Sequence, residues 1–205
     1  MKLLVFGATG GTGRALLEQG LAAGHEMAAF VRDPAGLGDP PHAHLEVIQG
    51  SVLDEDAVAA AVRGRDAVLS CLGTRPWRHT DICSGGTRVI ARAMAAVGVK
   101  RLIVLSSQGV GDSTLGALGR VMAAVALRRA FRDKLQMEAE LGGTALDWVV
   151  VRPGLLTNGA PRGTWRTAVD GSLVGSRIAR ADVAAFMLQQ LASDEFVRRR
   201  PVLVW

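Results

Sequence analysis

The sequence contains no tyrosine, and aromatic residues make up only 4% of its 205 positions. The lack of tyrosine excludes any reaction mechanism in which a phenol donates the proton. With so few aromatic residues, the core has to be built mainly from Ala, Val and Leu. Because 49% of the residues are hydrophobic and 21% are charged, the composition is that of a folded chain. Its length suits one domain.

Long apolar runs are also missing. No run approaches the ~18 residues of a membrane span, and the apolar run at the N-terminus ends at glycines before it reaches the length of a secretory signal. The two cysteines, Cys71 and Cys83, lack a second pair or a histidine cluster that would indicate a disulfide framework or a metal site. We therefore expect a cytoplasmic protein that binds neither metal nor membrane.

Basic residues outnumber acidic ones, which gives a net charge of +5 and an isoelectric point near 10.2. Such a balance can indicate a nucleic acid or an anionic small molecule as ligand. The arginines are scattered apart from short groups at 128–129 and 198–200, and no basic repeat is interleaved with aromatic residues. The pattern therefore does not favour a nucleic-acid partner.

Short apolar runs alternate with Ala-rich segments that have helical spacing. The apolar runs predict strands at 3–6, 27–31, 45–48, 67–71, 101–105, 148–151 and 202–205. The other segments predict helices at 11–23, 54–62, 81–97, 115–141 (continuous or broken) and 181–191. Continuous apolar strands between helices are typical of a parallel sheet that is covered on both faces. We expect a Rossmann-like, doubly wound α/β domain over 1–205. Its substrate-side segment at 154–205 is expected to be irregular over 154–178 and to end in a helix and a strand.

A glycine-rich turn, G-x-x-G-x-x-G over residues 7–13, joins the first predicted strand to the first predicted helix. Its glycines permit a tight turn and let the backbone approach a pyrophosphate, while the helix N-terminus offers free N–H groups to the phosphates. A purely structural turn is the alternative. The turn predicts a dinucleotide site formed by Gly7, Thr9, Gly10, Gly11, Thr12 and Gly13.

The end of the second predicted strand bears on the choice of cofactor. Arg32 comes first there and Asp33 follows. A guanidinium at this place favours the 2′-phosphate of NADP(H), whereas a carboxylate that faces the ribose would favour NAD(H). We expect NADP(H), with NAD(H) as the less favoured cofactor. Asp54, after the third strand, is either an adenine contact or a helix N-cap.

Several segments together resemble the atypical short-chain dehydrogenase/reductases. They are residues 7–13, Val31-Arg32-Asp33, 50–54, the run 66–75, Leu105-Ser106-Ser107, 168–171 and 176–178. Within this family the chain resembles the NAD(P)H-binding group that includes the biliverdin-IXβ and flavin reductases. The resemblance spans nearly the whole chain, and the run 66–75 is its most specific part.

The resemblance implies a cofactor site and a catalytic serine. Besides the glycine turn, the cofactor would contact Arg32, Asp54, Leu72, Gly73, Arg75, Ser106 and Ser107. Ser107 occupies the place of the family's catalytic serine, near the nicotinamide. The alternative is that Ser106 and Ser107 only cap the segment that follows. The substrate would lie against Trp77, Pro153, Gly154 and Leu155, and Trp165 is a further candidate for stacking.

The chain departs from most of this family at the proton donor. Most relatives use Tyr-x-x-x-Lys; here Lys134 matches the lysine, and Ala130 stands where the tyrosine belongs. Lys134 and Leu155 also stand where the bilin-lining histidines of the reductase would be. We expect Ser107 and Lys134 to be the catalytic residues. The role expected for Ser107 is to orient the nicotinamide or to donate a hydrogen bond to the acceptor, without acid–base chemistry of its own.

Two functions compete on this basis. The first is an NADPH-dependent reductase of a planar conjugated acceptor, such as a flavin, a bilin or a quinone, which can take its proton from water. The second is a non-enzymatic NAD(P)-binding redox sensor of the NmrA-like type. A ketone reductase or sugar-nucleotide epimerase is poorly supported, because developing alkoxide charge needs a positioned acid. We expect a monomer rather than a dimer.

Overall fold

The computed structural model describes residues 1–38, 43–73, 81–111, 128–173 and 177–205. Its main sheet contains β1 (Lys2–Phe6), β2 (Glu26–Val31), β3 (Leu45–Gln49), β4 (Ala67–Ser70), β5 (Arg101–Leu105), β6 (Asp147–Pro153), β8 (Arg166–Ala168) and β10 (Val202–Val204). The strands lie in the order β3-β2-β1-β4-β5-β6-β10-β8. All neighbours are parallel except β8, which runs antiparallel to β10. This confirms the expected Rossmann-like sheet.

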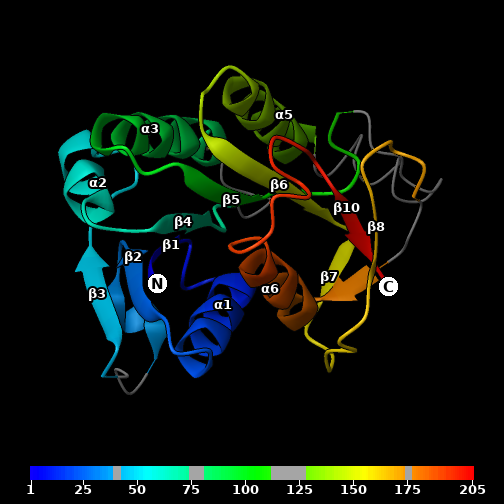
Figure 1. Ribbon diagram of the computed structural model, residues 1–205, viewed down its shortest axis with the longest axis horizontal. Coiled ribbons are helices and arrows are strands. Elements are labelled where there is room, and N and C mark those ends of the chain that lie inside the picture. Colours follow the sequence, from blue (N-terminus) through cyan, green and yellow to red (C-terminus); the bar gives the residue numbers. More distant parts are fainter. Residues whose placement is uncertain (39–42, 74–80, 112–127, 174–176) are drawn as a thin grey trace.

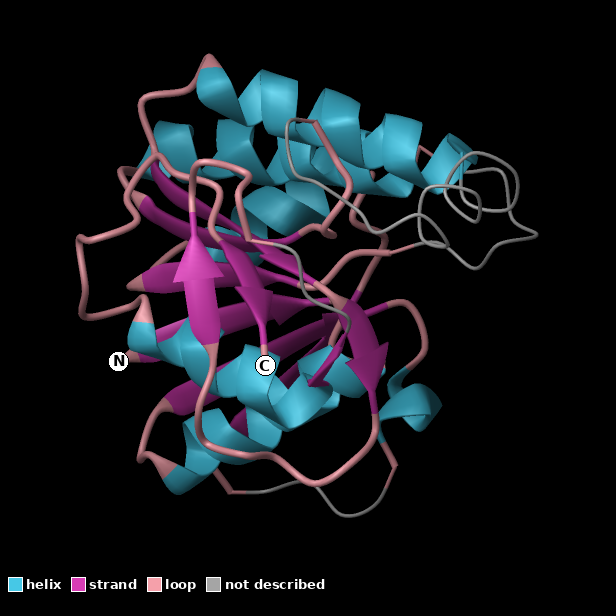
Figure 2. Cartoon of the chain, turned by 90° about the vertical axis from the view of Figure 1, so that its right-hand side faces the viewer, coloured by secondary structure: helices cyan, strands magenta, loops and turns pink. Residues whose placement is uncertain are grey.

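Helices cover both faces of the sheet (Figures 1 and 2). One face carries α1 (Gly11–Ala22) and α6 (Arg180–Gln189), and the other carries α2 (Glu55–Val62), α3 (Ile82–Val97) and α5 (Arg128–Gly142). A short 3₁₀ helix, η1 (Pro34–Leu37), follows β2. Because β1 and β4–β6 are buried on both faces, their sequences read as continuous apolar runs.

The C-terminal third is more regular than the sequence suggested. The segment 154–178, expected to be irregular, contains β7 (Leu155–Thr157), β8 and the start of β9 (Arg177–Ala179), and β7 pairs with β9 in a separate two-stranded sheet. These strands are only three residues long, so their periodicity is too short to be recognised in the sequence. Of the helix expected at 115–141, the structure describes α5, and residues 112–127 lie outside the described part.

Asp182 anchors this C-terminal third. Its side chain is 1% exposed and accepts hydrogen bonds from the backbone N–H groups of Arg162 and Gly163 at 2.9 and 3.0 Å. Its Oδ2 also accepts from Nε1 of Trp205 at 2.8 Å. Trp165 packs edge-to-face on Phe186 of α6, with ring centroids 5.9 Å apart. One carboxylate on α6 thus ties the loop before β8 to the C-terminal residue.

Candidate functional site

The direction of strand order reverses between β1 and β4. From β1 the chain builds outward to β2 and β3, and from β4 it builds the other way to β5 and β6. Ligands of doubly wound sheets bind outside the carboxyl ends of the strands at such a reversal. The segments there are the glycine turn after β1 and Cys71-Leu72-Gly73 after β4. They are in close contact, since a Cβ on Gly7 would lie 2.4 Å from the carbonyl oxygen of Cys71.

Two glycines of the turn are required by its geometry. Gly7 has a φ of +72°, in the left-handed region that residues with a side chain rarely adopt. A Cβ on Gly13 would lie 2.3 Å from the carbonyl oxygen of Gly7, so only glycine lets α1 pack this closely on the end of β1. These contacts agree with the roles expected for the first and last glycines of a dinucleotide-binding turn.

The N-terminus of α1 lies open beside this turn. Thr9, Gly10 and Gly11 are exposed, and the N-cap residue Gly10 makes no side-chain cap. The first N–H groups of a helix have no acceptor within the helix. A Cβ on Gly10 would contact only the carbonyl oxygen of Gly7, at 3.3 Å, so space remains over this residue. The arrangement fits the pyrophosphate of a dinucleotide.

Two arginines that the sequence analysis did not select also lie at the turn. The side chain of Arg180 lies against Gly11, and its Nη1 donates to Oδ1 of Asn158 at 2.6 Å. Arg14 donates to the carbonyl oxygens of Thr9 and Gly36 at 3.1 and 2.6 Å, which ties the turn to η1. Arg180 comes from α6, far away in sequence, so no local motif indicated it.

After the end of β2, the side chain of Asp33 is engaged in a hydrogen bond, whereas, within the part of the chain that the structure describes, that of Arg32 is not. Oδ1 of Asp33 accepts from the backbone N–H of Ala35 at 3.0 Å and so caps η1. The Arg32 side chain is exposed, and its guanidinium has no hydrogen-bond or ion-pair partner among the described residues. Arg32 is therefore the residue of the two that has its charge available to a ligand.

Asp54 caps α2, because its Oδ1 accepts from the backbone N–H of Ala57 at 3.0 Å. This is the alternative that the sequence left open, and an additional adenine contact stays a prediction. The neighbouring Leu53 is 56% exposed at the carboxyl end of β3. An exposed leucine beside Asp54 offers an apolar surface to a planar base.

After β5, the two serines have separate roles. Ser106 is 1% exposed and its hydroxyl donates to Oε1 of Glu138 at 2.6 Å. Ser107 is partly exposed and its Oγ accepts a hydrogen bond of 2.6 Å from Nζ of Lys134. Lys134 also donates to the carbonyl oxygen of Ser106 at 2.9 Å. The geometry thus brings the two expected catalytic residues, Ser107 and Lys134, into direct contact.

Burial lowers the pKa of Lys134, and the nearby Cys83, Glu138, Asp133 and Cys71 counteract this effect. Burial raises the pKa of both Cys71 and Cys83 to about 12, with Lys134 opposing the shift. The thiols are therefore neutral near pH 7. A lysine with a lowered pKa gives up its proton more readily than an ordinary one.

The remaining residues expected to contact the cofactor or the substrate are only partly described. Pro153 is buried at the end of β6, Gly154 follows it, and Leu155 is 71% exposed. Arg75 and Trp77 lie outside the described residues. Trp165 is engaged with Phe186 in the packing described above. Leu72 packs partly against the core, and the exposed Gly73 has open space around its Cα.

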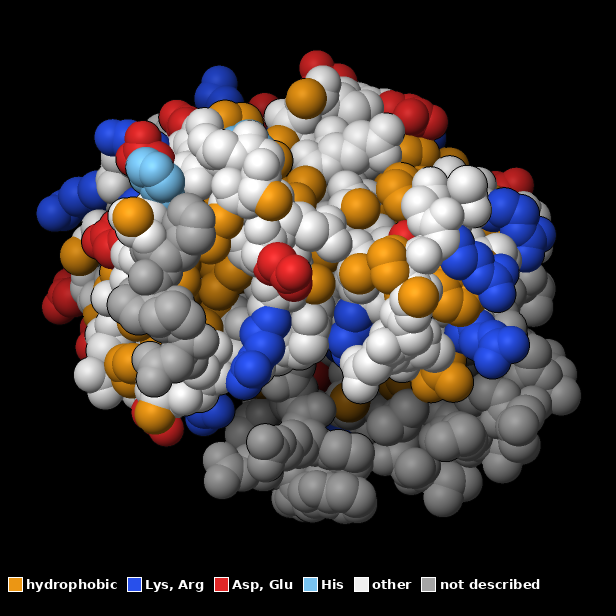
Figure 3. Space-filling model, turned by 90° about the horizontal axis from the view of Figure 1, so that it is seen from below, with side chains coloured by type: hydrophobic (Ala, Val, Ile, Leu, Met, Phe, Trp, Pro, Cys, Tyr) orange, Lys and Arg blue, Asp and Glu red, His pale blue; other side chains and the backbone are white. Residues whose placement is uncertain are grey.

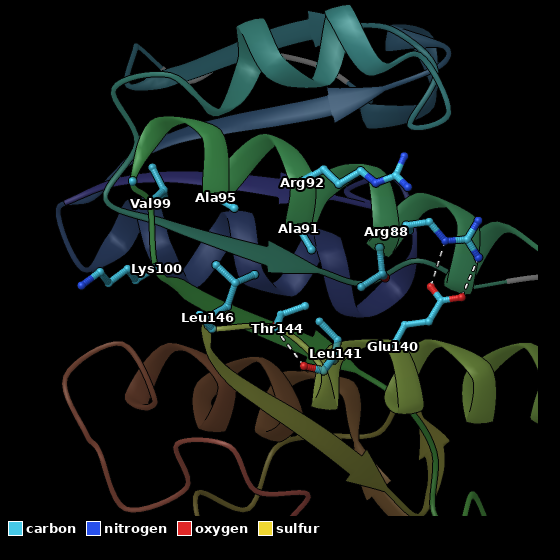
Figure 4. A pocket seen from close by; sticks show the side chains of 13 residues that line it. Arg88, Ala91, Arg92, Ala95, Val99, Lys100, Glu140, Leu141, Thr144 and Leu146 are labelled. Carbon is cyan, nitrogen blue, oxygen red and sulfur yellow. Dashed lines mark hydrogen bonds and ion pairs between the residues drawn. The ribbon is translucent and has the colours of Figure 1, made fainter.

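A separate pocket of about 480 Å³ lies between α3 and α5 (Figure 4). Its walls come from α3, from the end of α5 and from the short segments that follow the two helices, and the Arg88–Glu140 ion pair closes one side at 2.5 Å. Because β5 and β6 begin directly after these helix ends, the pocket lies at the amino edge of the sheet. It is therefore not part of the candidate cofactor site.

Figure 3 shows the face that carries α1 and α6, where described Lys and Arg side chains lie among other types and several of them gather at the right of the view. No group of three His, Cys, Asp or Glu residues that could hold a metal occurs within the described ranges. Among the described helices, none has both the length and the apolar character needed to cross a membrane.

Comparisons with known sequences identify the family. The profile of the NAD(P)H-binding family matches residues 7–194. An uncharacterised chloroplast protein of Arabidopsis thaliana is 28% identical over 95% of this chain and 73% of its own length. The 3β-hydroxysteroid dehydrogenase/Δ5→4-isomerase of Mycobacterium tuberculosis is 30% identical over 88% of this chain, which spans only 56% of that relative.

Solved structures agree with this assignment. ChuY, an anaerobilin reductase of Escherichia coli O157:H7, superposes with a TM-score of 0.81 at 27% identity, over 100% of this chain and 97% of its own. A short-chain dehydrogenase/reductase of Veillonella parvula in complex with NADP has a TM-score of 0.83 over 100% of this chain and 94% of its own, and at 16% identity it shows the fold alone. The family profile covers the glycine turn, the two catalytic candidates and every strand except the first and the last, β1 and β10. This chain belongs to the NAD(P)H-binding family.

Proposed function

We propose that this protein is an NADPH-dependent reductase that transfers hydride to a planar conjugated acceptor, with a free flavin as the first candidate. The observation that carries the proposal is the open, uncapped N-terminus of α1 at the reversal of strand order, with Ser107 and Lys134 in contact after β5. The first feature suits a dinucleotide, and the second suits the reacting end of that dinucleotide.

The residues at the strand ends divide the cofactor site into three parts. Arg32, Leu53 and Asp54 would hold the 2′-phosphate and the adenine beside β2 and β3. The glycine turn and Arg180 would hold the pyrophosphate. Leu72, Gly73 and Ser107 would hold the nicotinamide side beside β4 and β5. When bound, NADPH supplies a hydride at its nicotinamide, and the protein supplies position and surroundings.

NADPH is preferred over NADH in this proposal because of the two residues after β2. One carboxylate oxygen of Asp33 accepts the hydrogen bond that caps η1. The exposed guanidinium of Arg32, in contrast, has no hydrogen-bond or ion-pair partner within the described residues. Arginine binds a phosphate through charge-assisted hydrogen bonds.

A planar conjugated acceptor fits the missing tyrosine. Reduction of a ketone concentrates negative charge on one oxygen, whereas reduction of a flavin, bilin or quinone spreads it over a ring system. Ala130, at the place of the tyrosine, has no acidic group to offer. The exposed Leu155 beside the end of β6 offers apolar surface to a flat ring. ChuY, which is described as an anaerobilin reductase, is similar over the full length of this chain.

The test is anaerobic single-turnover mixing of the NADPH-loaded protein with FMN, FAD, biliverdin or a quinone. Acceptor reduction well above the spontaneous rate, with acetophenone-type ketones unreduced, would support the proposal. If NADPH binds but no acceptor is reduced faster than in buffer, the protein is instead a redox sensor that binds NAD(P) without turnover.

A further inference from the structure

The hydrogen bonds around Ser106 and Ser107 separate a structural serine from a reactive one. The Ser106 hydroxyl donates its hydrogen bond to the carboxylate of Glu138. The Ser107 oxygen instead accepts a hydrogen bond from Lys134, and the Ser107 hydroxyl donates no hydrogen bond to any of the described residues. A hydroxyl has one donor and two acceptor positions. The Ser107 hydroxyl can therefore donate a hydrogen bond to a ligand. Lys134, which is hydrogen-bonded to the same oxygen, is placed to supply a second proton.

A buried ion pair lies directly behind these serines. Glu138 on α5 and Arg152 on β6 are 2% and 3% exposed. Nη2 of Arg152 lies 2.6 Å from Oε2 of Glu138, and its Nε lies 3.2 Å from both carboxylate oxygens. Nε of Arg200 approaches Oε2 of Glu138 at 3.4 Å. Such short bonds to a buried carboxylate hold it in one position.

Glu138 connects this ion pair to the reactive residues in two ways. It lies four residues after Lys134, so both side chains project from the same face of α5. It also binds the Ser106 hydroxyl, whose residue immediately precedes Ser107. Lys134 in turn contacts both serines. The end of β5 and one face of α5 are thus joined at three hydrogen bonds, which leaves the Ser107–Lys134 contact little freedom.

We propose that Ser107 and Lys134 deliver the proton that accompanies hydride transfer, and that Glu138, held by Arg152, is the positioning residue of this pair. The inference rests on the proposed reductase function. The hydride brings one hydrogen nucleus and two electrons from NADPH to the acceptor, and the reduced acceptor then takes up one proton. The O–H bond of Ser107 breaks to supply it, a proton of Lys134 Nζ replaces it, and water reprotonates the amine. From the sequence we expected water to be the direct donor.

Lys134 is surrounded by groups of both kinds of charge. On α5, Asp133 and Glu138 favour its protonated form, while Asp133 itself caps α3 by accepting from the N–H groups of Cys83 and Ser84 at 2.9 and 2.8 Å. The neutral thiols of Cys83 and Cys71 face it from α3 and from the end of β4. From β6, Arg152 acts on it through Glu138.

Burial opposes the charge on Lys134 and lowers its pKa. Its proton is then lost as the pH rises through a value below that of a free lysine, so an acid role gives activity that is present at lower pH and falls on the alkaline side. Removing the charge of Glu138 takes away a group that favours the cation. The pKa of Lys134 should fall further, and the loss of activity should begin at lower pH.

The first experiment follows the titration of Lys134 without any turnover. The chain has only three lysines, Lys2, Lys100 and Lys134, so a protein labelled with ¹³C at lysine Cε gives three assignable NMR signals. We expect one signal, absent in Lys134→Arg, to titrate at a lower pH than a free lysine. Glu138→Gln should move this midpoint to lower pH, while the matched variant Glu140→Gln, on the same helix but paired with Arg88, should leave it in place.

The second experiment measures kcat and KM for the best acceptor across pH. Lys134→Arg keeps the positive charge, but the pKa of a guanidinium is too high for it to give up a proton. We therefore expect kcat to fall by about a hundredfold, as for loss of a general acid. Glu138→Gln should lower kcat by about tenfold with little change in KM and should shift the alkaline limb in parallel with the NMR midpoint. Glu140→Gln should match the wild type.

The outcomes separate the two proposals. If the wild type reduces no acceptor, the proposed function fails, whatever the titration shows. If it reduces an acceptor and Lys134→Arg retains full kcat, or if the alkaline limb does not follow the Lys134 midpoint, the proton comes from elsewhere and this inference is overturned. Should Glu138→Gln not fold, Lys134→Arg and the wild-type titration still decide the matter.

Discussion

The side chain of Arg180 lies directly on Gly11, at the first residue of α1. A Cβ on Gly11 would lie 2.6 Å from Cδ and 2.9 Å from Nε of Arg180. The guanidinium bonds to neutral partners, Oδ1 of Asn158 at 2.6 Å and the carbonyl oxygen of Leu156 at 3.5 Å. It therefore adds a positive charge beside the positive end of the helix dipole. An anion between the two would be stabilised by both.

Replacing Arg180 by methionine should weaken NADPH binding by about 10- to 100-fold, the effect of losing hydrogen bonds to a charged group. Calorimetric titration measures this. Adenosine 2′-monophosphate, which has no pyrophosphate, should bind the variant and the wild type equally. Equal weakening of both ligands would show that Arg180 acts on the whole site rather than on the pyrophosphate.

Gly10 and Gly13 should respond differently to valine. A Cβ on Gly10 has its nearest contact at 3.3 Å, so Gly10→Val should fold, but its branched side chain should fill the space that the pyrophosphate needs and abolish NADPH binding. A Cβ on Gly13 would meet backbone at 2.3 Å, so Gly13→Val should destabilise the protein. Circular dichroism and calorimetry distinguish the two. Normal NADPH binding by a folded Gly10→Val variant would place the phosphates elsewhere.

Arg32→Ala should reduce the preference for NADPH over NADH. We expect the wild type to favour NADPH by about 1–3 kcal/mol, the range for a charge-assisted contact, and the variant to lose most of that difference. Binding of both cofactors is compared by titration. Arg63→Ala, at an exposed position after α2, is the matched control and should leave the preference unchanged. A wild type that binds both cofactors equally would contradict the assignment.

Cys71 and Cys83 should resist alkylation in the native protein. Their pKa values of about 12, compared with 9.0 for a free thiol, mean that each is almost entirely protonated at pH 8. Since the thiolate is the nucleophile, iodoacetamide should react about a thousandfold more slowly than with the unfolded chain. Mass spectrometry of native and urea-unfolded samples follows both sites. Rapid labelling of native Cys71 would show that its surroundings stabilise the thiolate.

Much of the fold was predictable because its signals are local. The strands β1, β2, β4, β5 and β6 are short apolar runs, because a strand that is covered on both faces requires such a run. The edge strand β3 is mostly exposed, and its sequence mixes apolar and polar residues. Gly98 ends α3 with a φ of +79°, as expected of a glycine after a helix. The short strands β7, β8 and β9 were missed, because three residues do not establish a periodicity.

Helix capping shows where local reasoning stops. Asp81 precedes α3 but makes no side-chain cap, and the cap is supplied by Asp133 from α5 instead. At Asp54 the local cap does form. The same residue type at the same kind of position thus has a different role, because the packing of α5 on α3 brings a second carboxylate to one helix end and not to the other.

The sequence by itself determined the alternation of strands and helices, the glycine turn at the first strand end, and the lack of a tyrosine acid, since each depends on residue types or on neighbours along the chain. Only the tertiary structure decided that Lys134 reaches Ser107, that Glu138 binds Ser106 and Arg152, and that Arg180 lies on Gly11. These contacts join residues on different elements. The packing of the helices on the sheet determines which side chains come within contact distance, and burial determines which charged groups pair.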